Sequence, residues 1–410
     1  MSPSLQLILL LLLVIGAAKL GGTVSAALGQ PTVLGKLLAG VILGPSALDL
    51  LHMRMFSSPH LPETLHSLAE LGVIFLMFMA GLRMESAELR EAGKAASLTA
   101  SLGVLVPFLG GMAAALAFGF GLAAAVFVGL LLTATSVSIS AQTLLELGKL
   151  RTRVGTAMLG AAVLDDILGL LLLSMFFASQ SSGGGAWSLL LLVGRLTLFL
   201  GGALLLGRRY LPRLVTAIRR WSVSEPVLTM AVLVILALAF GAEQLGSLAA
   251  ITGAFLAGLL LAQTDAKDEI DRAISPFTYA VLVPVFFVGI GLNTDLRALR
   301  ADQALLALAL CAVAVATKIV GCGLGARLAG LSGRESLQVG AGMVSRGEVG
   351  LIIAGMGVQQ GVIGADVFSV MVVVVLVTTL ATPVLLRLSF RSLPQAQQRQ
   401  GEEPELVVVG

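Results

Sequence analysis

Two adjacent aspartates stand in the middle of an apolar segment, in the run VLDDILG at positions 163–169. Successive residues of a helix point about 100° apart, so Asp165 and Asp166 face different partners. Two carboxylates this close in a low dielectric resist being ionised together, and each can therefore exchange a proton for a cation. A structural pair within a buried polar network is the alternative, but charges inside apolar spans usually serve ion or proton pathways.

Lys318 is a second charge inside an apolar segment, near the middle of residues 303–329. It lies too far from either end for its ammonium to reach water easily. A buried ammonium needs a counter-ion or must lose its proton. Asp165 or Asp166 is the candidate partner. The alternative is a static salt bridge that joins two helices.

A dense run of hydroxyl side chains, TATSVSIS, occupies positions 133–140 of a third apolar segment. Thr133, Thr135 and Ser136 offer oxygen atoms, and hydroxyls and freed carbonyls are good ligands for hard cations. Each hydroxyl could instead bond the carbonyl one turn back in its own helix. The density of the run favours local unwinding of the helix at this point.

The run SRGEVG at positions 345–350 places opposite charges on either side of a glycine in another apolar segment. If two broken helices cross there, their opposed ends meet at one point, and Arg346 and Glu348 could neutralise the helix dipoles. We interpret these two residues as charge compensation or gating groups rather than as cation ligands.

The composition indicates an all-α polytopic membrane protein. Of 410 residues 57% are hydrophobic and 12% charged, against about 25% charged in soluble domains. A bilayer span needs about 20 apolar residues. Residues 5–28 are interpreted as the first span rather than a signal peptide, because no positive charge precedes them. Thirteen such segments lie near 5–28, 31–50, 65–83, 93–119, 122–147, 152–180, 187–208, 224–243, 246–263, 274–292, 303–329, 335–360 and 366–390.

Charge distribution predicts the orientation and excludes some functions. Most of the 26 Lys and Arg residues fall in alternate connections, which should face the cytoplasm, while the other connections hold only Arg54, Arg297 and Arg300. The amino terminus is then outside and the carboxyl terminus inside, with 391–410 as a short cytoplasmic tail. A net charge of +3 without a basic patch argues against nucleic-acid binding. Cys311 and Cys322 lack metal-site spacing, and we expect no cofactor.

An internal repeat relates the two halves of the chain. Residues 78–82 (FMAGL) correspond to 288–292 (VGIGL), and Gly111 corresponds to Gly321 at the same offset of 210 positions. The first copy precedes a cytoplasmic connection and the second an external one, so the copies are inverted. Inverted repeats are typical of secondary transporters whose site lies near the midplane. A transporter, not an enzyme, is therefore expected.

These motifs together resemble the monovalent cation:proton antiporter-2 family, particularly NapA-type bacterial sodium/proton antiporters, across residues 5–390. The resemblance rests on positions 35–45 (GKLLAGVILGP) and 78–82, on Thr135-Ser136 and Asp165-Asp166, on Lys318, and on 345–348 (SRGE). It implies a homodimer of the NhaA/NapA-like fold, with thirteen helices and two crossed, unwound helices. It also implies one transporter unit over residues 1–390, in which an elevator-like core domain (mainly 65–180 and 274–390) moves against a dimerisation domain (mainly 5–50 and 187–263).

The resemblance also implies roles for single residues. Asp166 becomes the principal sodium ligand, with Asp165, Thr135 and Ser136 around the ion, and Asp165 becomes the partner of Lys318. Potassium-linked relatives commonly carry Gln at the position of Asp165, and electroneutral sodium relatives carry Asn. The aspartate here therefore resembles the electrogenic type, which exchanges cytoplasmic Na⁺ or Li⁺ for external H⁺ across a bacterial inner membrane.

The same residues allow other functions besides sodium/proton exchange. Potassium/proton exchange is the main rival, and a sodium-coupled symporter of the similarly folded bile-acid class fits the Asp pair and Lys318 less well. An intramembrane aspartyl protease needs its two aspartates on separate helices and usually a Gly-x-Gly-Asp motif, which this sequence lacks. A passive channel does not need buried titratable groups or an inverted repeat.

Overall fold

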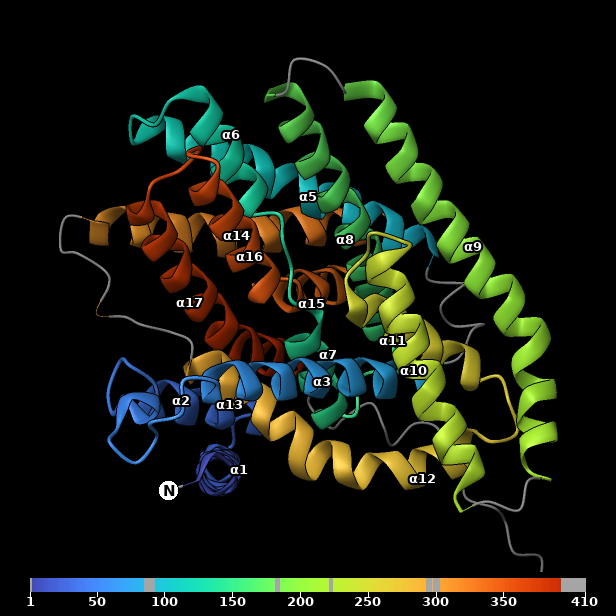
Figure 1. Ribbon diagram of the computed structural model, residues 1–410. Coiled ribbons are helices and arrows are strands. Elements are labelled where there is room, and N and C mark those ends of the chain that lie inside the picture. Colours follow the sequence, from blue (N-terminus) through green and yellow to red (C-terminus); the bar gives the residue numbers. More distant parts are fainter. Residues whose placement is uncertain are drawn as a thin grey trace, which may run out of the picture.

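The computed structural model describes residues 2–84, 93–180, 185–220, 224–292, 297 and 303–391. Within these ranges the side chains of 174, 177–180, 185–189, 348, 352, 359 and 365 are not described. The described part of the chain is helical and contains no strand (Figure 1). The all-α class expected from the composition is therefore confirmed.

The helices follow one another with short connections. The first half contains α1 (Pro3–Ala27), α2 (Thr32–Leu43), α3 (Leu61–Leu82), α5 (Gly93–Ala117), α6 (Leu122–Leu131), α7 (Val137–Glu146) and α8 (Arg153–Gln180). The second contains α9 (Gly185–Ile218), α10 (Pro226–Gln244), α11 (Ala250–Leu261), α12 (Lys267–Phe277), α13 (Val283–Leu292), α14 (Ala304–Leu328), α15 (Gly333–Gly342), α16 (Glu348–Gln359) and α17 (Ala365–Phe390). A π-helical turn at Thr278–Leu282 joins α12 to α13, and a 3₁₀ turn follows α2 at Leu50–His52.

Nine helical spans in the described ranges are long and apolar enough to cross a bilayer. Four apolar helices are shorter, and the thirteen-span count stays a prediction. The segment 122–147 is divided into α6 and α7, and 335–360 into α15 and α16. The segment 31–50 is helical only to Leu43, because Pro45 and the left-handed Asp49 turn the chain there.

The helices pack as two sets. One set contains α1, α2, α3, α9, α10, α11 and α13, in which α3 lies against α11 and α13 while α2 lies against α1 and α13. The other contains α5–α8 and α14–α17, with the repeat-related helices α5 and α14 packed along each other (Figure 1). We call these the scaffold set and the core set. Fewer contacts join them, through α2, α3 and α9 to α7, α8 and α17.

A partly buried carboxylate joins α7 of the core set to α2 of the scaffold set. Glu146 accepts a 2.6 Å hydrogen bond from the backbone N–H of Thr32, at the first residue of α2, and a short one from the Thr32 hydroxyl. The Lys36 ammonium lies 3.8 Å from the same carboxylate. An acidic group at a helix amino terminus is favourable, because it meets unpaired N–H groups and the positive end of the dipole.

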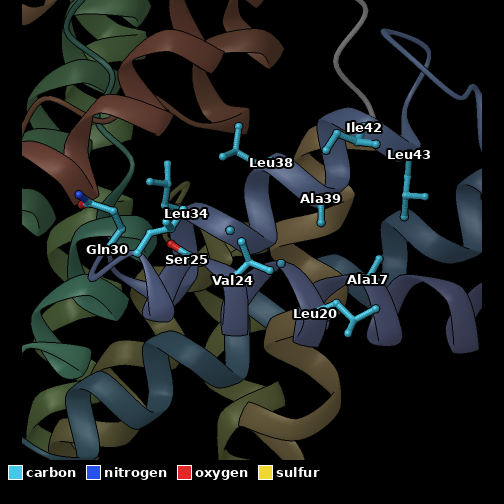
Figure 2. A pocket seen from close by; sticks show the side chains of 13 residues that line it. Ala17, Leu20, Val24, Ser25, Gln30, Leu34, Leu38, Ala39, Ile42 and Leu43 are labelled. Atoms are coloured by element: carbon cyan, nitrogen blue, oxygen red, sulfur yellow. The ribbon is translucent and has the colours of Figure 1, made fainter.

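The outer surface is apolar along its flanking helices. Most described side chains of α9 are exposed or half-buried, and many of them, such as Leu198 and Leu205, are large hydrophobic groups. A groove of about 450 Å³ runs between α1 and α2, with Gln30 and Leu43 at opposite ends (Figure 2). Apolar surface of this extent is suited to contact with lipid hydrocarbon.

The crossing of α3 and α11 depends on two glycines in contact with the opposite backbone. A Cβ atom at Gly81 would lie 2.2 Å from the Phe255 carbonyl oxygen, and one at Gly258 would lie 2.2 Å from that of Phe78. Small residues allow such close approach in membrane helix pairs, where packing rather than hydrophobicity holds the helices together.

Gly81→Ala should therefore force α3 and α11 apart. We expect a loss of about 1–3 kcal/mol, the usual cost of overpacking, seen as a clear drop in melting temperature in detergent. Gly201→Ala is the matched control, because a Cβ atom at that position in α9 would meet nothing within 4 Å. Equal melting temperatures for the two variants would show that the α3–α11 contact is not tight.

Candidate functional site

The centre of the core set contains a buried ion pair between α14 and α8. The Lys318 ammonium nitrogen lies 3.1 Å from Asp165 Oδ1 and 3.2 Å from Oδ2. The two side chains are 0% and 1% exposed. A pair this dry persists only with good geometry, since each charge has lost its hydration. Of the two partners that the sequence left open for Lys318, Asp165 is the one in contact.

A glycine on α5 makes room for Cys322, which lies next to this pair on α14. A Cβ atom at Gly103 would lie 2.4 Å from the Cys322 sulfur and 3.8 Å from the Lys318 nitrogen. Cys322 is one turn along α14 from Lys318 and is fully buried. The close packing of α5 on α14 therefore brings Gly103 near the ammonium.

Asp166 is partly buried and points to a different neighbour. Its Oδ2 accepts a hydrogen bond of 3.4 Å from the hydroxyl of Thr252, on α11 of the scaffold set. Asp166 also has an interaction beyond this one. The two carboxylates thus take distinct positions, as expected from their angular separation on α8. One is bound to a lysine within the core set, while the other faces the scaffold set.

The two helix breaks cross each other beside α8. The backbone N–H of Ser136, between α6 and α7, donates to the Ser345 carbonyl over 2.8 Å. In return the Ser345 hydroxyl donates to the Ser136 carbonyl over 2.6 Å, and Ser140 donates to the Gly342 carbonyl. These bonds satisfy the backbone groups that the breaks release, which is required of irregular backbone at membrane depth.

Arg346 lies fully buried at this crossing. Its guanidinium donates to the carbonyl of Leu132, over 2.8 Å, and to that of Val344, over 2.5 Å. A longer bond of 3.3 Å reaches Ala314 on α14. Leu132 follows the last residue of α6 and Val344 lies just beyond α15, so the cation meets the negative ends of two helices. The side chain of Glu348, the other predicted group, lies outside the described residues.

The hydroxyls of the α6–α7 break make local bonds. Thr133 donates to the Leu130 carbonyl over 2.7 Å, and Thr135 to that of Thr133 over 3.2 Å. The Ser136 and Ser138 hydroxyls lie 3.1 Å apart. A small cavity beside Thr135 and Ser136 is bordered by Ala162 of α8, one turn before the aspartates. Thr135 and Ser136 therefore line a space against α8 one turn before the aspartates, and Thr133 lies beside Gly169, one turn after them.

The structure brings most of the predicted site residues to one place and adds one. Asp165, Lys318 and Arg346 lie buried in the core set, together with the hydroxyls of Thr133, Thr135 and Ser136. Thr252 was missed, because one threonine in an apolar segment carries no distinctive pattern. Both aspartates lie on α8, whereas an aspartyl protease needs them on separate helices.

Comparison with known sequences places the chain in a family. Residues 9–388 match the family model described as "Sodium/hydrogen exchanger, transmembrane". A relative from Bacillus cereus, named Na(+)/H(+)-K(+) antiporter GerN, is 42% identical over 94% of this chain and 97% of its own length. The high-affinity Na(+)/H(+) antiporter NhaS3 of a Synechocystis strain is 34% identical over 97% of this chain and 92% of its own.

Comparison with solved structures agrees on the fold. The sodium proton antiporter MjNhaP1 of Methanocaldococcus jannaschii superposes with a TM-score of 0.67, over 95% of this chain and 99% of that one, at 18% identity. Together with the sequence matches, this accounts for almost the whole length of the chain. The protein is thus a multi-pass membrane protein of the sodium/hydrogen exchanger family, and it is a secondary transporter rather than an enzyme.

Proposed function

We propose that this protein is an electrogenic antiporter that exchanges cytoplasmic Na⁺ or Li⁺ for external H⁺. The observation that supports it best is the dry Lys318–Asp165 pair, with Asp166 next to it on α8. A static bridge would need one carboxylate, whereas this site holds two carboxylates and one ammonium. With a proton on Asp166 and the other two groups ionised, the empty site carries no net charge. Two carboxylates beside a neutral lysine carry two negative charges, of which a bound monovalent cation compensates one.

Asp166 is the proposed principal ligand of the cation, with oxygen atoms of Asp165, Thr135 and Ser136 completing the shell. Sodium and lithium prefer oxygen ligands of this kind, as other hard cations do. Arrival of the cation draws Asp165 away from Lys318, so both Asp166 and Lys318 can release a proton. Two protons then move against one cation, so each cycle carries one net charge across the membrane. The membrane potential drives that charge with about 2.3 kcal/mol per 100 mV.

Alternating access is proposed to arise from movement of the core set against the scaffold set, in the manner of an elevator. The packing supports a boundary that leaves α3 and α13 with the scaffold set, although residues 65–83 and 274–292 were expected in the core domain. We also propose that the protein belongs to the NapA-type branch of the antiporter-2 family and forms a homodimer. Its proposed location is a bacterial inner membrane, with the amino terminus outside.

Potassium is the alternative cation, and one observation favours it. The relative that is 42% identical carries both sodium and potassium in its printed name. The aspartate at position 165, in place of the Gln of potassium-linked relatives, is the reason to prefer sodium. Proton flux in proteoliposomes, driven in turn by Na⁺, Li⁺ and K⁺ gradients, separates the two proposals directly.

Asp166→Asn should abolish exchange, because the amide keeps the shape of the side chain but cannot trade a proton for a cation. The assay is cation-driven proton flux in proteoliposomes, after size-exclusion chromatography has shown that the variant is folded. Asp265→Asn is the matched control, since this carboxylate is exposed and pairs with Arg219 at the surface. Normal flux in the Asp166 variant would refute its assignment as the ion carrier.

Lys318→Gln should weaken or abolish the voltage dependence of exchange, because it removes one of two groups that release protons. The measurement is sodium/proton exchange in liposomes under an imposed potassium-diffusion potential, with Lys149→Gln, an exposed site, as control. The variant leaves Asp165 unpaired, so Lys318→Gln with Asp165→Asn serves as a charge-balanced version. Unaltered voltage dependence in both would identify Lys318 as a structural bridge.

Thr135→Val with Ser136→Ala should raise the apparent sodium requirement more than it lowers expression. The main-chain bond from Ser136 to Ser345 does not need the replaced hydroxyls, so the crossing should survive. The initial rate of proton flux is measured against sodium concentration, and protein yield is measured in parallel. An unchanged sodium requirement would mean that these hydroxyls only satisfy the local backbone.

A further inference from the structure

The hydroxyl of Thr252 is directed away from its own helix. Threonines inside helices commonly bond the carbonyl one turn back, as Thr143 does to Ile139 and Thr317 to Val313 in this protein. Thr252 is the third residue of α11 and is 5% exposed, and its hydroxyl instead donates to Asp166 of α8. The bond is long at 3.4 Å, but it connects the scaffold set with the proposed cation ligand.

The position of Thr252 is fixed by its own set of helices. The turn from α10 to α11 contains Ser247 in the left-handed region, at φ 56°. Arg195 of α9 donates to the carbonyls of Gln244 and Leu245 at the end of α10, over 2.5 Å and 3.1 Å. These two hydrogen bonds fix the turn between α10 and α11. Thr252, at the start of α11, is therefore held in place by contacts within the scaffold set.

A cavity of about 310 Å³ leads along this contact. It is bordered by one face of α8 (Gly160, Val163, Leu164 and Ile167), adjacent to the aspartates in the sequence, and by α11 from Thr252 to Leu259. Gly93 and Ser97, at the start of α5, border it as well. The Ser97 hydroxyl is bonded to the Gly93 carbonyl. Thr252 therefore both lines this largely apolar cavity and bonds Asp166.

We propose that Thr252 positions Asp166 for cations that arrive through this cavity, and that it does so on one side of the membrane only. A hydroxyl both donates and accepts, so it can hold the empty carboxylate toward the cavity and then turn its oxygen to the entering cation. Movement of α8 relative to α11 separates the two residues, and the opposite side never meets this hydroxyl. The inference rests on the proposed exchange function and adds a scaffold residue to it.

The side that the cavity serves follows from the charge of the neighbouring connection. α5 begins after a connection that contains Arg83 and Arg90, with Lys94 at its first turn, and these residues mark the cytoplasmic face. Everted membrane vesicles therefore present the cavity side to the medium, while right-side-out vesicles present the opposite side. The two preparations allow sodium to be offered to each side in turn.

Thr252→Val should raise the sodium concentration for half-maximal exchange in everted vesicles by roughly 3- to 10-fold, the size of one net hydrogen bond. The maximal rate should change little, and right-side-out vesicles should match the wild type. Thr252→Ser, which keeps the hydroxyl, should restore the wild-type value. Thr216→Val is the control, because its hydroxyl bonds the Pro212 carbonyl of its own helix at an exposed position of α9.

Each outcome decides the question. A wild-type value for Thr252→Val, an equal rise on both sides, or no restoration by Thr252→Ser would overturn the positioning role. If Thr252→Val does not fold, Thr252→Ala and Thr252→Ser provide the same comparison of residues without and with a hydroxyl. Absence of exchange in the wild-type protein from either side would instead refute the proposed function, and is distinguishable from all of these results.

Discussion

The dry ion pair between Lys318 and Asp165 is the interaction on which the site depends. Neither side chain touches solvent, so each must be compensated by the other, and removal of one partner from such a pair costs about 3–5 kcal/mol. The pair also joins α14 to α8, which lie in the two halves of the chain that the sequence pattern relates as an inverted repeat. Gly103 of α5 makes room for Cys322, one turn along α14 from Lys318. The charge pair therefore lies where α5 packs closely on both α8 and α14.

At the crossing of the two broken helices, buried backbone groups also need partners. Unwinding at 132–136 and 343–347 releases backbone groups inside the protein, and reciprocal bonds between Ser136 and Ser345 satisfy some of them. Arg346 supplies a buried cation to the carbonyl ends of both breaks. The carboxylate of Asp166, next to Asp165 on α8, faces the scaffold set and accepts a hydrogen bond from Thr252. A site that must bind and release ions needs one group that the core does not fully neutralise.

Charge and pattern made much of this site predictable from the sequence. A lysine and two aspartates inside apolar segments need partners, so their meeting follows from desolvation, and a run as polar as 133–140 favours a break. Thr252 could not be predicted, because most threonines in apolar helices bond their own backbone. The partners of Arg195 are carbonyls at a helix end, which no side-chain pattern indicates. The shorter α2 and the packing of α3 with α11 depend on turns and glycine contacts that hydropathy alone does not reveal.

The central claim is that cation binding opens the Lys318–Asp165 pair, so that two groups lose protons for each cation bound. Isothermal titration calorimetry of the purified protein with sodium, repeated in buffers of different ionisation enthalpy, counts the protons released at equilibrium without any transport. The account predicts close to two protons per sodium ion at a pH where Asp166 and Lys318 are both protonated in the empty site. Release of a single proton across the working pH range would contradict it, and would leave Lys318 as a permanent structural partner of Asp165.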